Sequence, residues 1–315
     1  MENRLIVSPS PHAHIDDSVA KIMWAVSLAL LPAGAAGVYF FGLKALWIII
    51  LGIVSAVATE IILQKLSKSK ITVSDGSAFL TGLLLAYNLP PGVPFWVPIV
   101  GSFFAIFIGK FVFGGLGKNI FNPALAGRAF LMASWPSLMT TFVKPFGYKY
   151  DAITSATPLA ALKEGKVMEH ISNLNLFFGN RPGCIGEVCV LALLAGAVFL
   201  LIKGYISWHI PFSFIGTVGF FTCVFGAKGL FNGDWLFHIL SGGLILGAFY
   251  MATDYVTSPL TRKGQIIFGI GCGLITGVIR LWGGYPEGVC YAILIMNAAT
   301  PLIDRYVRPR IYGTK

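Results

Sequence analysis

Two long apolar stretches near the start of the chain limit most strongly what it can fold into. Residues 22–42 and 44–64 are almost entirely apolar, and a helix of about 20 such residues crosses the roughly 30 Å hydrocarbon core of a bilayer. The composition agrees, since only 11% of the residues are charged and the mean hydropathy is +0.78, whereas a soluble domain has about 25% charged residues. The sequence therefore predicts an integral membrane protein.

Further apolar segments follow, and some are too short for a full span. Those at 76–88 and 120–135 are short, and Pro123 interrupts the second, which is typical of broken membrane helices. The full set after the first two is 76–88, 93–113, 120–135, 186–203, 209–227, 235–253, 265–283 and 287–303. We therefore expect an all-α membrane protein with ten transmembrane helices, five on each side of a polar interval.

An odd number of spans in each half places the second half upside down relative to the first, as in inverted-repeat transporters. The predicted repeats are 22–135 and 186–303, separated by the polar interval 136–185. A weak internal likeness supports them, because the stretch from Lys110 to Gly115 resembles that from Arg280 to Gly284. Gly-Gly and Asn-Pro pairs are also common wherever helices break, so the likeness alone does not establish a repeat.

The distribution of Lys and Arg predicts the orientation, because these residues are enriched in short cytoplasmic loops. Most of them fall on one side if the arm 1–21 is cytoplasmic, and the basic tail 304–315 then lies on the same side. The interval 136–185 is extracytoplasmic in this arrangement. The net charge of +10 is explained by topology and by contact with anionic lipid, and a nucleic-acid partner is not expected.

The remaining polar residues give no metal site. The five cysteines contain no CxxC pair, which argues against an iron–sulfur or zinc site. Charges inside apolar segments, at Glu60, Lys110 and Arg280, are expected to snorkel or form ion pairs. Asp75 and Asp254 border the helices most expected to be broken and are weaker hypotheses for an ion path.

One polar stretch in the interval 136–185 has a distinctive order: Asp151-Ala152-Ile153-Thr154-Ser155-Ala156-Thr157-Pro158-Leu159. A threonine followed by proline is a common helix start, with Thr157 as N-cap and Pro158 at the first helical position. The same letters closely resemble the sequence at which a flavin transferase joins FMN, through its phosphate, to a threonine. In that interpretation Thr157 carries the flavin, Asp151 contacts the transferase, and the small Ser155 and Ala156 give access to the hydroxyl.

Further motifs extend the resemblance over essentially the whole chain. They are Ser8-Pro9-Ser10-Pro11-His12, Ser74-Asp75-Gly76-Ser77-Ala78, Asn119-Ile120-Phe121-Asn122-Pro123-Ala124 and Gly127-Arg128-Ala129-Phe130. With these motifs in this order, the sequence resembles the D-subunit family of Rnf ion-translocating ferredoxin:NAD oxidoreductases. A relative of this family is the B subunit of the Na⁺-translocating NADH:quinone reductase. Ser155 stands where many members have glycine.

The resemblance implies a flavin-bearing subunit that is not catalytic alone, in the bacterial cytoplasmic membrane. FMN esterified to Thr157 would relay electrons, and the complex would couple transfer between ferredoxin and NAD to translocation of Na⁺ or H⁺. The implied partners are the other subunits of a six-subunit complex, a flavin transferase for maturation, and membrane lipid. The redox chemistry itself belongs to the cofactor.

The resemblance also implies a second, noncovalent riboflavin near the broken helix at Pro123. Asn119 and Asn122 are the predicted ligands, since an amide offers a donor and an acceptor to the imide edge of a flavin. Lys118 lies nearby. Arg128, five residues after Pro123, is predicted separately to hold the phosphate of a flavin nucleotide. Alternatively, the two Asn side chains satisfy backbone groups around Pro123, and Arg128 caps carbonyls.

Two other classes of protein fit part of the pattern. A channel or secondary transporter for a small solute or ion also has inverted repeats with broken helices, and a structural subunit without flavin is a third alternative. The sequence leaves open the coupling ion, the order of electron transfer and whether ions pass through this chain.

Overall fold

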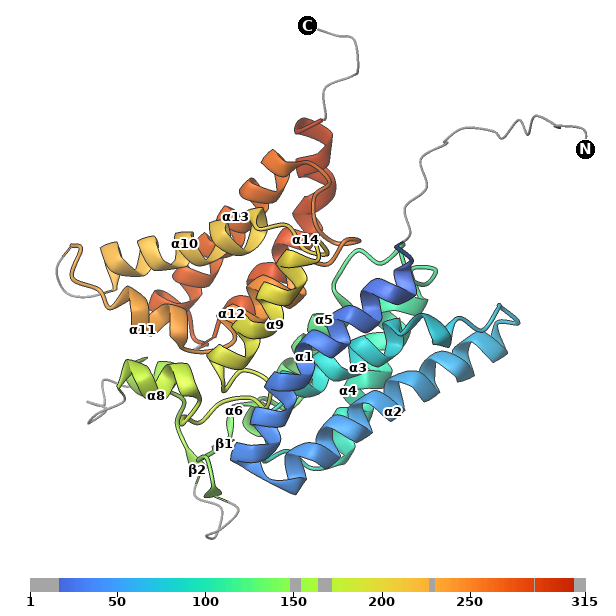
Figure 1. The fold of residues 1–315 in the computed structure, drawn as a ribbon, viewed down its shortest axis with the longest axis horizontal. Helices are drawn as coiled ribbons and strands as arrows, with labels where there is room; N and C mark the ends of the chain where they lie inside the picture. Colours follow the sequence, from blue (N-terminus) through green and yellow to red (C-terminus); the bar gives the residue numbers. More distant parts are fainter. Residues whose placement is uncertain (1–16, 148–153, 164–171, 227–229, 286, 309–315) are drawn as a thin grey trace, which may run out of the picture.

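The computed structural model describes residues 17–147, 154–163, 172–226, 230–285 and 287–308 (Figure 1). Within these ranges the chain is mostly helical, which confirms the predicted helical class. Three helices are long and apolar enough to cross a membrane: α1 (Val19–Phe41), α2 (Leu43–Leu66) and α13 (Arg262–Trp282).

The first half of the chain forms one helical group. After α1 and α2 come the short η1 (Val73–Asp75), α3 (Ser77–Tyr87), α4 (Trp96–Ile106), the π-helical turn η2 (Phe107–Phe111) and α5 (Pro123–Ser134). Local sequence explains the boundaries. Gly42, at φ 76°, reverses the chain between α1 and α2, a conformation that glycine adopts without steric cost.

Polar side chains begin α3 and α5 of this group. The Asp75 carboxylate accepts hydrogen bonds from the backbone N–H and the hydroxyl of Ser77 at 2.8 and 2.6 Å, where α3 starts. Asn122 caps α5 by accepting from the N–H groups of Ala124 and Leu125, and Pro123 occupies the first position of the helix. Proline fits there because its missing N–H has no partner inside a helix in any case.

The described residues of the polar interval form short elements only. They are α6 (Pro136–Thr140), β1 (Phe142–Val143), β2 (Thr154–Ser155), α7 (Pro158–Lys163) and α8 (Asn173–Phe178). The two strands pair antiparallel, with Phe142 opposite Ser155.

The second helical group contains α9 (Val190–Ile202), α10 (His209–Phe225), α11 (Trp235–Leu240), α12 (Leu244–Leu246), the π-helical turn η4 (Gly247–Met251), α13 and α14 (Val289–Tyr306). The apolar stretch 235–253, expected as one segment, is broken at Ser241–Gly243. Gly242 adopts φ 66° at the break, and its neighbours leave the helical ladder between α11 and α12. A break beside Asp254 was expected, but the apolar pattern could not place it at Gly242, because glycine is common in intact membrane helices as well.

The two groups meet along α1 with α9 and along α5 with α14. Gly196 allows the first contact, since a Cβ there would collide with the Ala29 carbonyl oxygen and the Tyr250 hydroxyl. Two tyrosines make similar hydrogen bonds. Tyr87 donates to the carbonyl of Leu30 at 2.9 Å, and Tyr250 donates to that of Leu193 at 2.8 Å.

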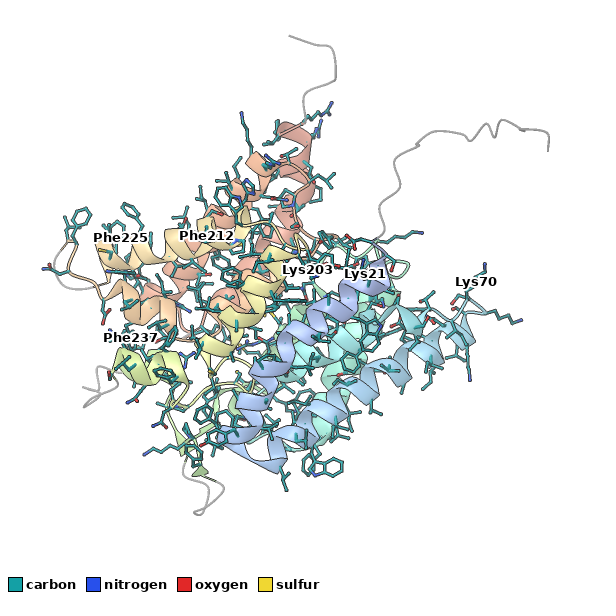
Figure 2. All side chains as sticks on the ribbon, viewed as in Figure 1. Lys21, Lys70, Lys203, Phe212, Phe225 and Phe237 are labelled. Carbon is teal, nitrogen blue, oxygen red and sulfur yellow. The ribbon has the colours of Figure 1, made fainter. Side chains whose placement is uncertain are left out.

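Apolar side chains cover the outside of the bundle and charged ones gather at helix ends. Figure 2 shows Phe212 and Phe225 on the outer side of α10, and Phe212 is 59% exposed. Lys21, Lys70 and Lys203 lie in the first turn of α1, after α2 and at the end of α9. An apolar surface with polar ends is the arrangement that a bilayer stabilises.

The bundle has two distinct ends (Figure 1). At the first, which we call the termini end, α1 begins and α14 ends. The Tyr205 hydroxyl, just after α9, donates to Asp17 at 3.3 Å there. At the other, which we call the strand end, lie β1 and β2, and the N–H of Phe146 donates to the carbonyl of Phe40 at 2.7 Å.

Candidate functional site

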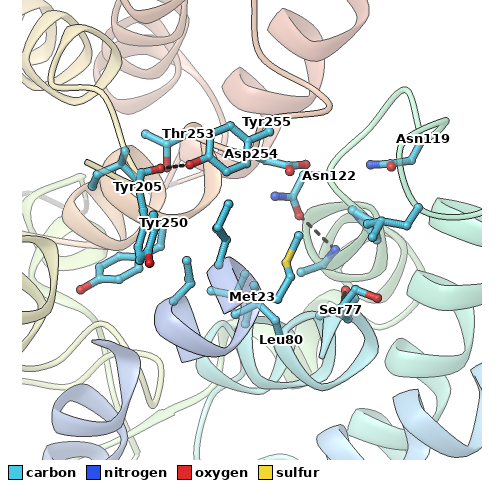
Figure 3. A pocket seen from close by; sticks show the side chains of 18 of the residues that line it. Met23, Ser77, Leu80, Asn119, Asn122, Tyr205, Tyr250, Thr253, Asp254 and Tyr255 are labelled. Atoms are coloured by element: carbon cyan, nitrogen blue, oxygen red, sulfur yellow. Dashed lines mark hydrogen bonds between the residues drawn. The ribbon is translucent and has the colours of Figure 1, made fainter. Parts of the chain in front are cut away.

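A pocket that opens to solvent lies between the two helical groups near the termini end (Figure 3), and its empty space, open solvent included, is about 780 Å³. Apolar side chains from α1, α3 and η4 form much of its wall. Polar side chains enter it at several points: Ser77, Thr81, Lys110, Asn119, Asn122, Tyr205, Tyr250, Thr253, Asp254 and Tyr255. An apolar pocket with a few converging polar groups is the usual form of a small-molecule or cofactor site.

Both predicted asparagines line this cavity, but their side chains differ in hydrogen bonding. Asn122 is 4% exposed and fully engaged, because its oxygen caps α5 and its nitrogen donates to the Met251 carbonyl at 3.2 Å. Asn119 is 5% exposed and donates to the carbonyl of Phe121 at 3.1 Å, while its side-chain oxygen has no partner. A buried acceptor without a partner costs about 1–3 kcal/mol. Asn119 is therefore the asparagine with an unused acceptor for a ligand.

The two basic residues predicted beside the asparagines lie elsewhere. Lys118 is exposed and does not line the cavity. Arg128 is buried in α5, where it donates to Glu187 at 3.1 Å, to Glu287 at 2.8 Å and to Asn88. Its guanidinium thus joins α5 to the segment before α9 and to the start of α14.

The lysine that lines the cavity is Lys110, in η2. Its ammonium donates to Glu60 of α2 at 2.7 Å and to the hydroxyl of Ser77 at 2.7 Å, and the Lys110 and Glu60 side chains are each 4% exposed. The expected ion pairing is confirmed for these two residues. Arg280, in α13, donates to the carbonyls of His238 and Ser241 instead.

Thr157 lies in a different part of the molecule, at the start of α7. Its side-chain oxygen accepts from the N–H of Ala160 at 3.3 Å, and the residue is 3% exposed. The predicted N-cap role of Thr157 is therefore confirmed. Ala156 is exposed, Ser155 contributes backbone to β2, and Asp151 lies outside the described residues.

Among the described residues, no group of three His, Cys, Asp or Glu side chains is placed to hold a metal ion. The five cysteines are free thiols.

Comparison of the sequence with known proteins identifies the family. The model of the family described as NQR2, RnfD, RnfE matches residues 6–313. The chain belongs to this family. It is 52% identical to the D subunit of the proton-translocating ferredoxin:NAD(+) oxidoreductase complex of Clostridium ljungdahlii, over 100% of this chain and 98% of the relative.

Two further relatives span nearly the full length. The D subunit of the Na(+)-translocating ferredoxin:NAD(+) oxidoreductase complex of Acetobacterium woodii is 54% identical over 99% of this chain and 96% of its own. The D subunit of the ion-translocating oxidoreductase complex of Stutzerimonas stutzeri is 41% identical over 95% and 93%. As a member of this family with long apolar helices, the chain is a membrane protein.

Sequence reasoning missed several polar residues of this NQR2, RnfD, RnfE family chain. Tyr205 and Tyr255 line the cavity, and Glu187 and Glu287 bind Arg128. Glu187 follows a glycine in a stretch without periodicity, so no sequence signal marked it as buried. Its carboxylate gains a partner in the fold only because Arg128, 59 residues earlier, is brought beside it.

Proposed function

We propose that this chain is the flavin-bearing membrane subunit of an Rnf-type complex, which couples electron transfer between ferredoxin and NAD to translocation of Na⁺ or H⁺. The observation that carries the proposal is the Asp151 to Thr157 motif in a chain with full-length relatives named as the D subunits of such complexes. The relatives differ in the ion they are named for. The partners of this chain are accordingly the other subunits of the complex.

The proposed attachment is an ester between the FMN phosphate and the Thr157 side-chain oxygen. The N-cap geometry is compatible with it, since an esterified oxygen still has a lone pair for the N–H of Ala160. At 3% exposure, however, the hydroxyl is not open to a transferase. Modification therefore precedes packing of this segment or requires it to open. Once bound, the flavin supplies one-electron transfer steps.

The cavity at the termini end is the proposed site of a second, noncovalent flavin. An isoalloxazine ring needs apolar walls and a paired imide edge, and the cavity offers both in its lining and in the unpartnered Asn119 oxygen. Asn122 then acts by starting α5 and joining it to η4. Lys110 brings a positive charge to the wall.

The proposed topology is ten membrane helices in two inverted repeats, with both termini cytoplasmic in a bacterial cytoplasmic membrane. The paired tyrosines support a repeat, because Tyr87 and Leu30 are 57 residues apart and so are Tyr250 and Leu193. Tyr250 follows Tyr87 by 163 residues, and Leu193 follows Leu30 by the same number. Asn88 and Met251 are also 163 residues apart, and the Asn88 side-chain nitrogen lies 3.6 Å from the Met251 sulfur. Equivalent residues in contact with each other are expected on a pseudo-two-fold axis.

Fluorescence of the denatured chain tests the covalent flavin. The protein, produced together with a flavin transferase, is expected to give a fluorescent band in a denaturing gel, and Thr157→Ala is expected to remove it. A wild-type chain without fluorescence would favour the channel or transporter hypothesis instead.

Thiol labelling tests the orientation, because Leu162 is 51% exposed at the strand end and Tyr306 is 75% exposed at the termini end. With Cys189 and Cys223 replaced by Ser, Leu162→Cys is expected to react with an impermeant reagent in intact cells. Tyr306→Cys is expected to react only after permeabilisation. The opposite result would reverse the proposed topology.

A further inference from the structure

The short helix that follows Thr157 is held against the second helical group by one lysine. Lys163, the last residue of α7, donates from its ammonium to the carbonyl of Ile279 at 3.1 Å, to that of Tyr285 at 2.6 Å and to that of Gly283. These three carbonyls belong to the last turn of α13 and the residues after it. The end of a helix carries unpaired carbonyls and partial negative charge, which a cation stabilises.

A second contact lies near the start of α7. Leu159 is 3% exposed, and its Cδ1 is 2.9 Å from the position that a Cβ on Gly242 would occupy. Gly242 is the residue at which the second group's helix breaks, and the Arg280 guanidinium lies 3.2 Å from the same position. The six-residue helix is thus fixed at both ends on the second helical group.

The electrostatics favour carbonyls over a carboxylate as the partner of Lys163. Among the described residues no Asp or Glu pairs with its ammonium. Desolvation lowers the pKa of Lys163 below its ordinary value. A charged amine that is partly desolvated gains most from several aligned acceptors, and three carbonyls provide them.

We propose that Lys163 is a positioning residue for the flavin on Thr157, because it docks α7 on the end of α13 and so fixes the attachment point. This inference rests on the proposed covalent flavin, six residues before Lys163. A tethered flavin that must exchange electrons with other centres needs a defined place, and the ester bond alone leaves its anchor free to move. The contacts of Lys163 with the end of α13 fix this position, and Lys163 takes no part in the redox reaction of the flavin.

The experiment compares variants in the complete purified complex. Lys163→Met removes the donors, Lys163→Arg keeps charge and donors, and Lys163→Gln keeps a single short donor group. Lys44→Met is the matched control, because Lys44 lies at the same end of the bundle and donates to the carbonyl of Gly92 at 2.9 Å, in the first helical group. It removes the same charge from the same end without touching α7.

Two readouts are measured for each variant. Hydrogen exchange of the α7 amides is expected to be about tenfold faster in Lys163→Met, the effect of losing about one charge-assisted hydrogen bond. The rate at which reduced ferredoxin reduces the covalent flavin is expected to fall by at least about threefold, because transfer depends on position. Lys163→Arg and Lys44→Met are expected to show the wild-type exchange and reduction rates. Lys163→Gln is expected to give rates between those of Lys163→Met and the wild type.

Several outcomes would overturn the inference. If the α7 amides of Lys163→Met exchange hydrogen at the wild-type rate, Lys163 does not hold α7 on α13. If they exchange faster but the covalent flavin is reduced at the wild-type rate, Lys163 holds α7 but does not position the flavin. The same slow reduction in Lys44→Met would assign the effect to charge alone. A wild-type chain that carries no flavin would refute the proposed function, while the exchange data would still decide whether Lys163 docks α7.

Discussion

The two regions proposed to hold flavin differ in how they are built. At the termini end, a largely apolar pocket that opens to solvent lies between the helical groups, and Asn119 presents an unused acceptor. At the strand end, Thr157 lies at the start of a six-residue helix, is 3% exposed, and already uses its oxygen as a helix cap. The region at the termini end is a pocket, and the region at the strand end is a buried attachment residue.

The difference follows from how each region would retain a ligand. A noncovalent ligand must repay the loss of its own freedom through contacts, so its site needs a preformed, mostly apolar pocket. A covalent ligand is retained by its bond, and its site needs only a reachable hydroxyl during modification and a fixed anchor afterwards. The contacts of α7 with α13 and Gly242 fit the second requirement.

The largest expected effect separates the two regions directly. Thr157→Ala removes the attachment oxygen, so the purified complex is expected to lose all covalent flavin from this chain and nearly all ferredoxin:NAD electron transfer. Acid-extractable flavin from the cavity is expected to stay at the wild-type level. Thr157→Ser, which keeps a hydroxyl, is the control and is expected to retain flavin. Loss of both flavins in Thr157→Ala would contradict the independence of the two regions.

A second variant damages the cavity wall alone. Lys110→Leu leaves the buried Glu60 carboxylate without its cation, and breaking one partner of a buried pair costs about 3–5 kcal/mol. Unfolding of the purified chain in detergent is expected to show this loss, and extractable flavin is expected to fall. The double variant Lys110→Leu, Glu60→Leu removes both charges and is expected to recover most of the stability. No recovery would indicate that Lys110 acts through Ser77 instead.

Asn119 tests the ligand side of the cavity. Asn119→Leu removes the unpartnered oxygen, and an unmatched buried group costs about 1–3 kcal/mol, which is roughly fivefold to over a hundredfold in affinity. Extractable flavin is expected to fall while the covalent flavin remains. An unchanged content in the folded variant would assign Asn119 to the backbone at Phe121.

The smallest expected effect is that of the helix cap. Asn122→Ser keeps a side-chain oxygen that can accept from the N–H groups at the start of α5 but loses the donor to Met251, whereas Asn122→Ala loses both. Loss of an N-cap costs about 0.5–2 kcal/mol, so Asn122→Ala is expected to be less stable than Asn122→Ser by an amount in this range. Equal stability of the two variants in denaturant titrations would show that the cap contributes little.

Local signals in the sequence predicted much of the fold. The apolar runs at 22–42 and 44–64 became α1 and α2 with shifts of only a few residues. Helix caps could also be predicted from local residues. The interpretation of Asn122 as a partner of the backbone around Pro123 is confirmed, and so is the interpretation of Thr157 as an N-cap. Such features depend on neighbours in the chain.

Long-range partners could not be predicted in the same way. Lys110 and Glu60 are 50 residues apart, and Arg128 and Glu287 are 159 apart. Hydropathy showed that these charges are costly in a membrane, but only the packing of the helices decides which of them meet. The same holds for Arg280, whose partners are the carbonyls freed by the break at Gly242. The flavin on Thr157 and the role of Asn119 remain predictions.

Fragmentation mass spectrometry of the peptide that contains Thr157 tests the central claim most directly. The chain is produced with a flavin transferase, purified and digested, and the site of any added mass is located among Thr154, Ser155 and Thr157. We expect a peptide heavier by one FMN less one water, with the fragments placing the addition on Thr157. An unmodified peptide, or an addition on Thr154 or Ser155, would contradict the proposed attachment.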